Sequence, residues 1–132
     1  MRIVLDASAL MAFLEARAGA EKLEEIIRLG VTGKRELLMS AVNWGEVYYS
    51  AWREHGERAA RKTLAEIAQL PIEIVDADLE LTRSAAEIHT QHRLPYADSF
   101  AAALASTTGA AVATSDRDFT RVGDLVELIW IS

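Results

Sequence analysis

Acidic side chains recur at the points where apolar runs of the sequence end. Asp6 ends one such run, Glu46 follows a second, and Asp98 lies early in a late helical segment. Further acids follow other apolar runs, namely Asp76, Asp78, Asp116 and Asp118. Carboxylates within a few ångströms of one another cannot all stay ionised without cations. A hard divalent cation such as Mg²⁺, held by oxygen ligands, is the chemistry that this pattern could support.

Each acid also has a purely structural interpretation, because acids and small hydroxyls commonly cap helices. The segment Asn43-Trp44-Gly45-Glu46 resembles a capping box, and Ser8 could cap the first helix. Ser115 or Asp116 could stabilise the turn after the fourth strand in the same way. We assign Asp76 and Asp78 to the start of the next helix, one as its cap and the other at its first turn.

Asp6 and Asp98 are harder to explain as caps. Asp6 ends a strand that is apolar throughout, so we expect its carboxylate to be partly desolvated, which is costly without a partner. Asp98 precedes the small-residue segment SFAAALAS, which suits close packing against a sheet and predicts that this acid faces inward. Both acids therefore favour a bound cation.

Strands and helices alternate along the chain and would bring these acids together. We predict strands over residues 2–6, 37–41, 71–75, 111–114 and 126–131. We predict helices over residues 9–17, 21–29, 43–55, 57–69, 78–92 and 96–107. This alternation is typical of the α/β class, with a parallel sheet between helices and ligands at the carboxyl ends of the strands. The chain of 132 residues is predicted to form one domain, residues 1–132.

Composition excludes several other classes of protein. With 51% hydrophobic and 26% charged residues the chain is expected to be globular, and without cysteine it has no disulfides or thiolate metal sites. No apolar stretch is long enough for a membrane span or a signal peptide, so we expect a cytoplasmic protein. The net charge of −6 excludes a protein that coats nucleic acid electrostatically. Four carboxylates at one site would account for most of that charge.

Other chemistries of α/β sheets lack their residues here. Nucleotide-binding turns need glycines where the chain has Ala7-Ser8-Ala9-Leu10, and an aspartyl-phosphate phosphatase needs an acid where Ser8 stands. A receiver domain needs a late lysine, but none follows Lys62, and no nucleophile elbow is present. The three histidines are predicted to lie on the surface: His55, His89 and His92. Metal-assisted phosphoryl chemistry survives this comparison best.

Four segments in order resemble the PIN-domain family, specifically the VapC-type toxin nucleases of prokaryotic toxin–antitoxin pairs. They are Val4 to Leu10, Asn43-x-x-Glu46, Tyr96 to Ser99, and Thr114 to Phe119. The resemblance covers essentially the whole chain. It implies a three-layer α/β/α sandwich with a central parallel sheet and an acidic pocket that binds Mg²⁺ or Mn²⁺.

The resemblance also implies roles for individual residues. The four acidic positions match Asp6, Glu46, Asp98 and Asp116. Asp6 and Asp98 are the firmest direct ligands, whereas Glu46 and Asp116 would bind through water or complete a second metal site. The supporting positions are Ser8, Asn43, Thr114, Ser115 and Asp118, and Asp118 could share the role of Asp116. The implied activity is hydrolysis of RNA by a homodimeric toxin with a cognate antitoxin.

Two further groups of side chains have open interpretations. Three arginines near the same edge could hold flanking phosphates or be solvated: Arg93, Arg117 and Arg121. Trp44, Tyr48 and Trp52 recur every four residues on a face away from Glu46, which favours core packing over a dimer surface or a groove for a partner helix.

Three functional hypotheses follow. The first is a metal-dependent endoribonuclease that acts as a toxin. The second is a non-catalytic PIN-like regulatory module that binds a metal or a partner, and the third is a metal-dependent phosphatase. The complete set of acids favours catalysis, because a structural role would tolerate Asn or Ser at some of them.

Overall fold

A five-stranded parallel sheet runs through the protein, whose residues 1–132 are all described by a computed structural model. Its strands are β1 (Arg2–Leu5), β2 (Glu36–Ser40), β3 (Ile72–Val75), β4 (Ala111–Thr114) and β5 (Leu128–Trp130). They lie in the order β3-β2-β1-β4-β5, and Val4 of β1 pairs with Leu38 on one side and Val112 on the other. The predicted parallel sheet is confirmed.

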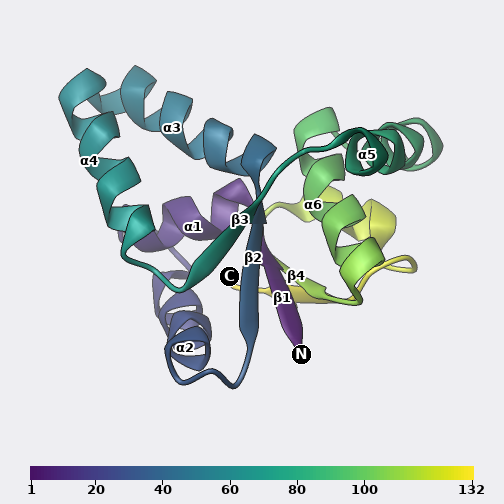
Figure 1. Cartoon of the computed structure of the whole chain (residues 1–132), viewed down its shortest axis with the longest axis horizontal. Coiled ribbons are helices and arrows are strands. Elements are labelled where there is room, and N and C mark those ends of the chain that lie inside the picture. Colours follow the sequence, from purple (N-terminus) through teal and green to yellow (C-terminus); the bar gives the residue numbers. More distant parts are fainter.

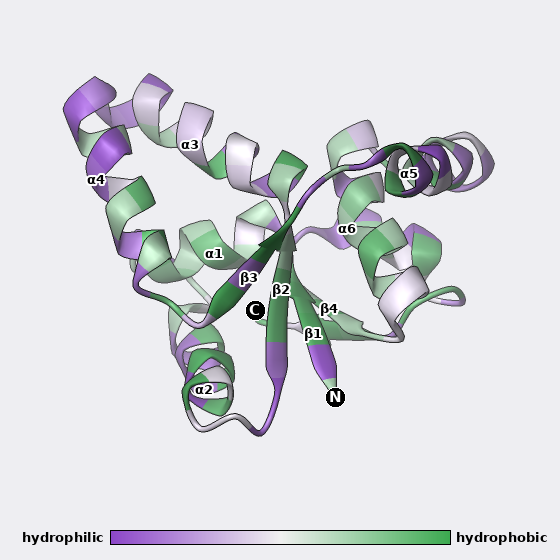
Figure 2. Ribbon diagram, in the orientation of Figure 1, coloured by the Kyte–Doolittle hydropathy of each residue, from purple (hydrophilic) through white to green (hydrophobic).

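Helices cover both faces of this sheet (Figure 1). They are α1 (Ala7–Leu14), α2 (Ala20–Val31), α3 (Ala41–His55), α4 (Glu57–Ala68), α5 (Leu79–His92) and α6 (Tyr96–Thr108), with a 3₁₀ helix η1 (Arg117–Val122). Figure 2 shows hydrophobic residues along most of the sheet and hydrophilic residues on the outer helices α4 and α5. Each helix is too short or too polar to cross a membrane.

Two hydrophobic cores, one on each face, make this a three-layer α/β/α sandwich. Successive residues of β1 point to opposite faces. Ile3 and Leu5 therefore lie in the core with α1, α2 and α3, whereas Val4 lies in the core with α5 and α6. Residues Ala101–Ala105 of α6 are all buried, and the small side chains of the four alanines among them let this helix pack closely on the sheet. The predicted architecture is confirmed.

Helix starts differ from the sequence prediction in two places that bear on the site. Asp6, not Ser8, caps α1, since its side chain accepts a hydrogen bond from the backbone N–H of Ala9 at 2.8 Å. The predicted capping box at Asn43 is also wrong. Strand β2 continues directly into α3 without a loop, so Ser40 is the cap and Asn43 is already inside the first turn.

Other capping predictions are confirmed in part. Asp78 caps α5 by accepting from the N–H of Leu81 at 2.8 Å, and Asp116 caps η1. Asp76 is exposed, precedes α5 and accepts no hydrogen bond, so its predicted role at the first turn is wrong. His55 and His89 are exposed as predicted, whereas His92 is half-buried.

The aromatic stripe on α3 belongs to the core only at its inner end, where Trp44 packs against the core that contains Val47. The ring centres of Trp44 and Tyr48 lie 6.0 Å apart, and those of Tyr48 and Trp52 lie 5.8 Å apart. Trp44 and Tyr48 are only half-buried and Trp52 is 43% exposed, so the core interpretation is wrong for the outer end of the stripe. The stripe follows one flank of the helix, beside the buried face rather than on it.

Candidate metal centre

Asp6 stands at the carboxyl end of the central strand and is 2% exposed. Its carboxylate accepts hydrogen bonds from Ser8 Oγ at 2.8 Å, Thr114 Oγ1 at 2.5 Å and the N–H of Ala9 at 2.8 Å. These donors come from the start of α1 and from the end of β4, the strand beside β1. They fix the orientation of the carboxylate where two strands end together.

The turn after β4 is tied to the same point by the same hydroxyls. Thr114 Oγ1 accepts from the N–H of Asp116 at 2.9 Å, and Ser8 Oγ accepts from the N–H of Ser115 at 3.1 Å. Asp116 in turn accepts from the N–H of Asp118 at 2.9 Å. Ser8 and Thr114 thus hold Asp6 and this acidic turn in a fixed relation.

Asn43 links the two helices that carry the remaining acids. Its side chain is fully buried, and its Nδ2 donates to Glu46 Oε1 at 2.9 Å and to the carbonyl of Ala97 at 3.1 Å. Both partners are acceptors, so the orientation of the amide is fixed. Its Oδ1 is buried without a hydrogen-bond partner. Asn43 therefore holds Glu46 of α3 against the start of α6, next to Asp98.

Asp98 lies in the first turn of α6, beside two acids from the turn after β4. One carboxylate oxygen from each of Asp98, Asp116 and Asp118 lies within 4.8 Å of the others. The nearest cation recorded for this trio is Arg121, whose Nη1 lies 3.7 Å from Asp118. Asp118 is thus part of the acidic group, as the sequence left open.

Asp6 and Glu46 are not in this 4.8 Å group, but their charges act on Asp98. Burial and, after it, the charges of Asp116, Asp6 and Glu46 together raise the pKa of Asp98 to about 8. Burial also raises the pKa of Asp6 to about 6, against the hydrogen bonds from Thr114, Ala9 and Ser8 that favour its ionised form. Burial and neighbouring charges raise these pKa values because both make the ionised carboxylate less stable.

The donor set fits a hard divalent cation. All the convergent ligand atoms are carboxylate oxygens, which suit Mg²⁺ or Mn²⁺ rather than a metal that prefers nitrogen or sulfur. A bound cation would relieve the repulsion that raises the pKa of Asp98. The arrangement can therefore concentrate positive charge at the carboxyl edge of the sheet.

The three predicted phosphate-binding arginines differ in their surroundings. Arg121 donates to the carbonyl of Arg93 at 2.9 Å and lies beside Asp118, which places both arginines near the acids. Arg117 instead stacks on Trp130, 4.1 Å from the ring centre, and donates to the carbonyl of Ser132 at 2.6 Å. Arg117 is engaged with the end of the chain.

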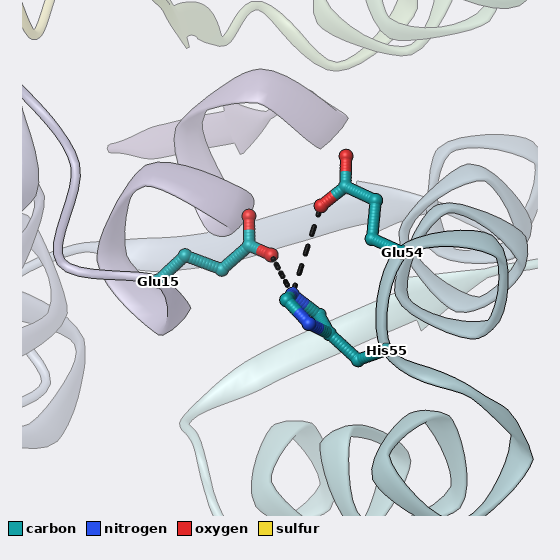
Figure 3. A group of neighbouring side chains, drawn as sticks. All are labelled: Glu15, Glu54 and His55. Carbon is teal, nitrogen blue, oxygen red and sulfur yellow. Dashed lines mark hydrogen bonds and ion pairs between the residues drawn. The ribbon is translucent and has the colours of Figure 1, made fainter.

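A second group of possible ligands lies elsewhere, where α1 and α3 end (Figure 3). His55 Nε2 lies 3.0 Å from Glu15 Oε1 and 3.7 Å from Glu54 Oε2. Arg17 pairs with both carboxylates, at 3.3 Å from Glu54. Because Arg17 and His55 both contact these two carboxylates, the group is an ion-pair network. Sequence reasoning missed it, since its members carry no motif.

Comparisons with known proteins agree with this geometry. The sequence matches the PIN domain family over residues 3–125. No curated protein sequence matches the chain.

Among solved structures, the chain is similar to VapBC2 from Rickettsia felis bound to a promoter DNA fragment, with 18% identity, 98% of each chain covered and a TM-score of 0.76. DNA-bound VapBC from Salmonella typhimurium is 16% identical, with 100% of this chain and 99% of that chain covered and a TM-score of 0.74. The sarcin-ricin loop cleaving toxin VapC20 from Mycobacterium tuberculosis is 22% identical, with 92% of this chain and 95% of that chain covered and a TM-score of 0.71. At these identities the likeness concerns the fold.

Proposed function

Because this chain belongs to the PIN domain family, we propose that it is a metal-dependent endoribonuclease that acts as the toxin of a toxin–antitoxin pair. The observation that carries the proposal is the gathering of Asp6, Glu46, Asp98 and Asp116, where burial and then the charges of the other three acids raise the pKa of Asp98 to about 8. In a protein that binds no cation here, replacing one of these acids by a neutral residue would stabilise the fold. The complete set favours a catalytic role over a structural one.

Asp6 and Asp98 would hold the ion directly, and Glu46 and Asp116 would bind it through water or complete a second site. When bound, Mg²⁺ or Mn²⁺ lowers the pKa of a coordinated water and offsets negative charge on a phosphodiester. Ser8 and Thr114 orient Asp6 by their hydrogen bonds.

The remaining residues would support this arrangement from around it. Asn43 orients Glu46, and Ser115 and Asp118 belong to the turn that positions Asp116. We assign contacts with flanking phosphates to Arg93 and Arg121, because Arg117 would first have to leave Trp130.

We further propose a cognate antitoxin as the protein partner and a homodimer in the cytoplasm. Support for the antitoxin comes from the structural neighbours, which include a toxin–antitoxin complex from Klebsiella pneumoniae and a member of the VapBC family of toxin–antitoxin systems from Mycobacterium tuberculosis. The homodimer rests on the family resemblance.

The proposal is tested by incubating the purified, partner-free protein with total RNA and a short labelled oligoribonucleotide. Parallel reactions contain Mn²⁺, Mg²⁺ or EDTA, and Asp6→Asn serves as the control for contaminating nucleases. We expect discrete fragments that require metal and are absent with the variant. Absence of cleavage by a sample that binds metal would favour the non-catalytic regulatory module, and cleavage of phosphomonoesters alone would favour the phosphatase.

A further inference from the structure

Tyr49 and Arg53 form an exposed pair on α3, the helix that also carries Glu46. The guanidinium carbon of Arg53 lies 5.6 Å from the centre of the Tyr49 ring, and Tyr49 is 54% exposed. The adjacent acid Glu54 pairs with Arg17 and His55 instead, and Arg53 has no ion pair. The pair thus presents an aromatic ring and an uncompensated positive charge to solvent.

The geometry of the helix places this pair on the same side as Glu46. At about 100° per residue, Arg53 lies roughly 20° and Tyr49 roughly 60° around the helix from Glu46. Arg53 is two turns farther along, about 10 Å from Glu46 in the direction of the axis. Trp44 and Tyr48 lie roughly 160° around the helix from Glu46, and Trp52 lies roughly 120° from Glu46 and roughly 60° from Tyr49. Tyr49 and Arg53 therefore extend the acidic site along α3.

Each member of the pair suits one part of a nucleotide. The guanidinium of Arg53 has no hydrogen bond or ion pair, so its N–H groups are free to bind a phosphate. An exposed tyrosine ring offers a surface on which an unpaired base can stack without regard to sequence. We propose that Tyr49 and Arg53 bind single-stranded RNA beside the bond to be cleaved, with a base stacked on Tyr49 and a phosphate held by Arg53.

This inference rests on the proposed nuclease function and extends it to the path of the substrate. Figure 1 shows α3 leaving the carboxyl edge of the sheet on one side while α5 and α6 lie on the other. Arg93 and Arg121 stand on the side of α5 and η1. An RNA strand whose scissile phosphate lies at the acids would place further phosphates on both sides of them. On the α3 side, the cation without an ion pair that lies on the same side of the helix as Glu46 is Arg53.

The test measures binding of a short labelled oligoribonucleotide of mixed sequence by fluorescence anisotropy. The protein carries Asp98→Asn to prevent cleavage, and Mg²⁺ is present. We expect Tyr49→Ala and Arg53→Ala each to weaken binding about tenfold. Tyr49→Phe should keep wild-type affinity, because the ring still stacks. Arg53→Ala should also reduce the slope of log affinity against log salt by about 0.7.

Arg35→Ala is the matched control. Arg35 likewise has no ion pair, but it precedes β2 at the opposite edge of the sheet. Its removal should leave affinity within about twofold of the parent protein, because remote surface charge is screened at physiological salt. In the cleavage assay, Tyr49→Ala and Arg53→Ala should raise KM and leave kcat within about twofold of wild type.

The outcomes separate this inference from the nuclease proposal. Metal-dependent cleavage with unchanged KM in both variants would overturn the inference and leave the nuclease standing. RNA binding that depends on both residues, in a protein that cleaves nothing, would support the inference and overturn the nuclease. If the variants keep their RNA affinity and instead lose self-association or antitoxin binding, the pair belongs to a protein interface and the inference is wrong.

Discussion

Asp98 is the side chain whose ionisation is most affected by its neighbours, and it offers the sharpest test at the scale of single residues. We expect Asp98→Asn to lower metal-dependent cleavage by at least about a hundredfold, since even hydrogen-bond partners of metal ligands contribute about 10- to 100-fold. The metal-free variant should melt at the same temperature as wild type or higher, most clearly above pH 8, where the carboxylate of Asp98 is ionised in wild type and repels its neighbours.

Asp76→Asn is the control for Asp98→Asn, because it makes the same substitution at an exposed acid without hydrogen bonds. It should change neither cleavage nor melting temperature. A large loss of metal-free stability in Asp98→Asn would show that Asp98 is a structural residue.

The raised pKa of Asp98 makes the stability of the metal-free protein depend on pH. Its carboxyl group titrates near 3.8 in the unfolded chain and about 8 in the folded protein. The stability that the bound proton provides is therefore complete below pH 3.8 and is lost as pH rises to about 8. Asp6, with a pKa of about 6, adds to the same trend at lower pH.

Melting curves in EDTA between pH 5 and 8.5 measure this dependence. We expect the melting temperature of wild type to fall with pH and that of Asp98→Asn to fall less. Equal slopes for the two proteins would contradict the assigned cause.

Asn43 is the residue whose role the sequence indicated least well. We expect Asn43→Ala to destabilise the protein by about 1 kcal/mol, because the half-buried acceptors of Glu46 and Ala97 lose their donor. It should also weaken Mn²⁺ binding by about 10- to 100-fold, as expected when the partner of a metal ligand is removed. Calorimetric titration with Mn²⁺ separates the second effect from the first.

Ser50→Ala is the control for Asn43→Ala, because Ser50 is a buried polar residue on the same helix with no side-chain hydrogen bond. It should leave the affinity for Mn²⁺ unchanged. Normal Mn²⁺ affinity in a folded Asn43→Ala variant would mean that Asn43 has only a structural role.

At the scale of elements, α6 positions Asp98 by packing closely on the sheet. Ala102 is fully buried in that contact. We expect Ala102→Leu to cost about 1–3 kcal/mol, because the added methylene groups must displace the helix. Displacement of α6 should also weaken Mn²⁺ binding, whereas Ser106→Leu, at an exposed position of the same helix, should not. Thermal melts and Mn²⁺ titrations of both variants test this role.

The order and type of the elements could be predicted from the sequence, because apolar runs and helical periodicity are local signals. The start of α3 could not, because β2 passes into it without the loop residues that mark a boundary. The sequence therefore suggested a cap at Asn43, where the structure has a buried link to Ala97.

Side-chain partners from distant segments were beyond the reach of sequence reasoning. The Asp6 contact with Thr114 spans 108 positions, and it entered only as a family resemblance. The network of Glu15, Arg17 and His55 has no motif, and the exposure of Trp52 depends on where α3 meets its neighbours. Periodicity identified the helix face of Trp52 but not what covers it.

At the scale of the whole molecule, the candidate centre lies where all three layers meet. Asp6 comes from the central strand, Glu46 from a helix on one face, Asp98 from a helix on the other, and Asp116 from the turn after β4. No single helix or strand carries two of these four acids, so the site depends on the complete fold.

This convergence also concentrates much of the molecule's charge. The four acids supply up to four of the six net negative charges of the chain. One or two divalent ions would neutralise much of that charge at the point where a phosphate must approach.

The most direct test of the central claim is the position of bound Mn²⁺ in a crystal, located by its anomalous scattering. We predict a strong peak within bonding distance of Asp6 and Asp98, and its loss in a crystal of Asp98→Asn. A peak at Glu15, Glu54 and His55 alone, or none between the acids at the carboxyl edge of the sheet, would contradict the account.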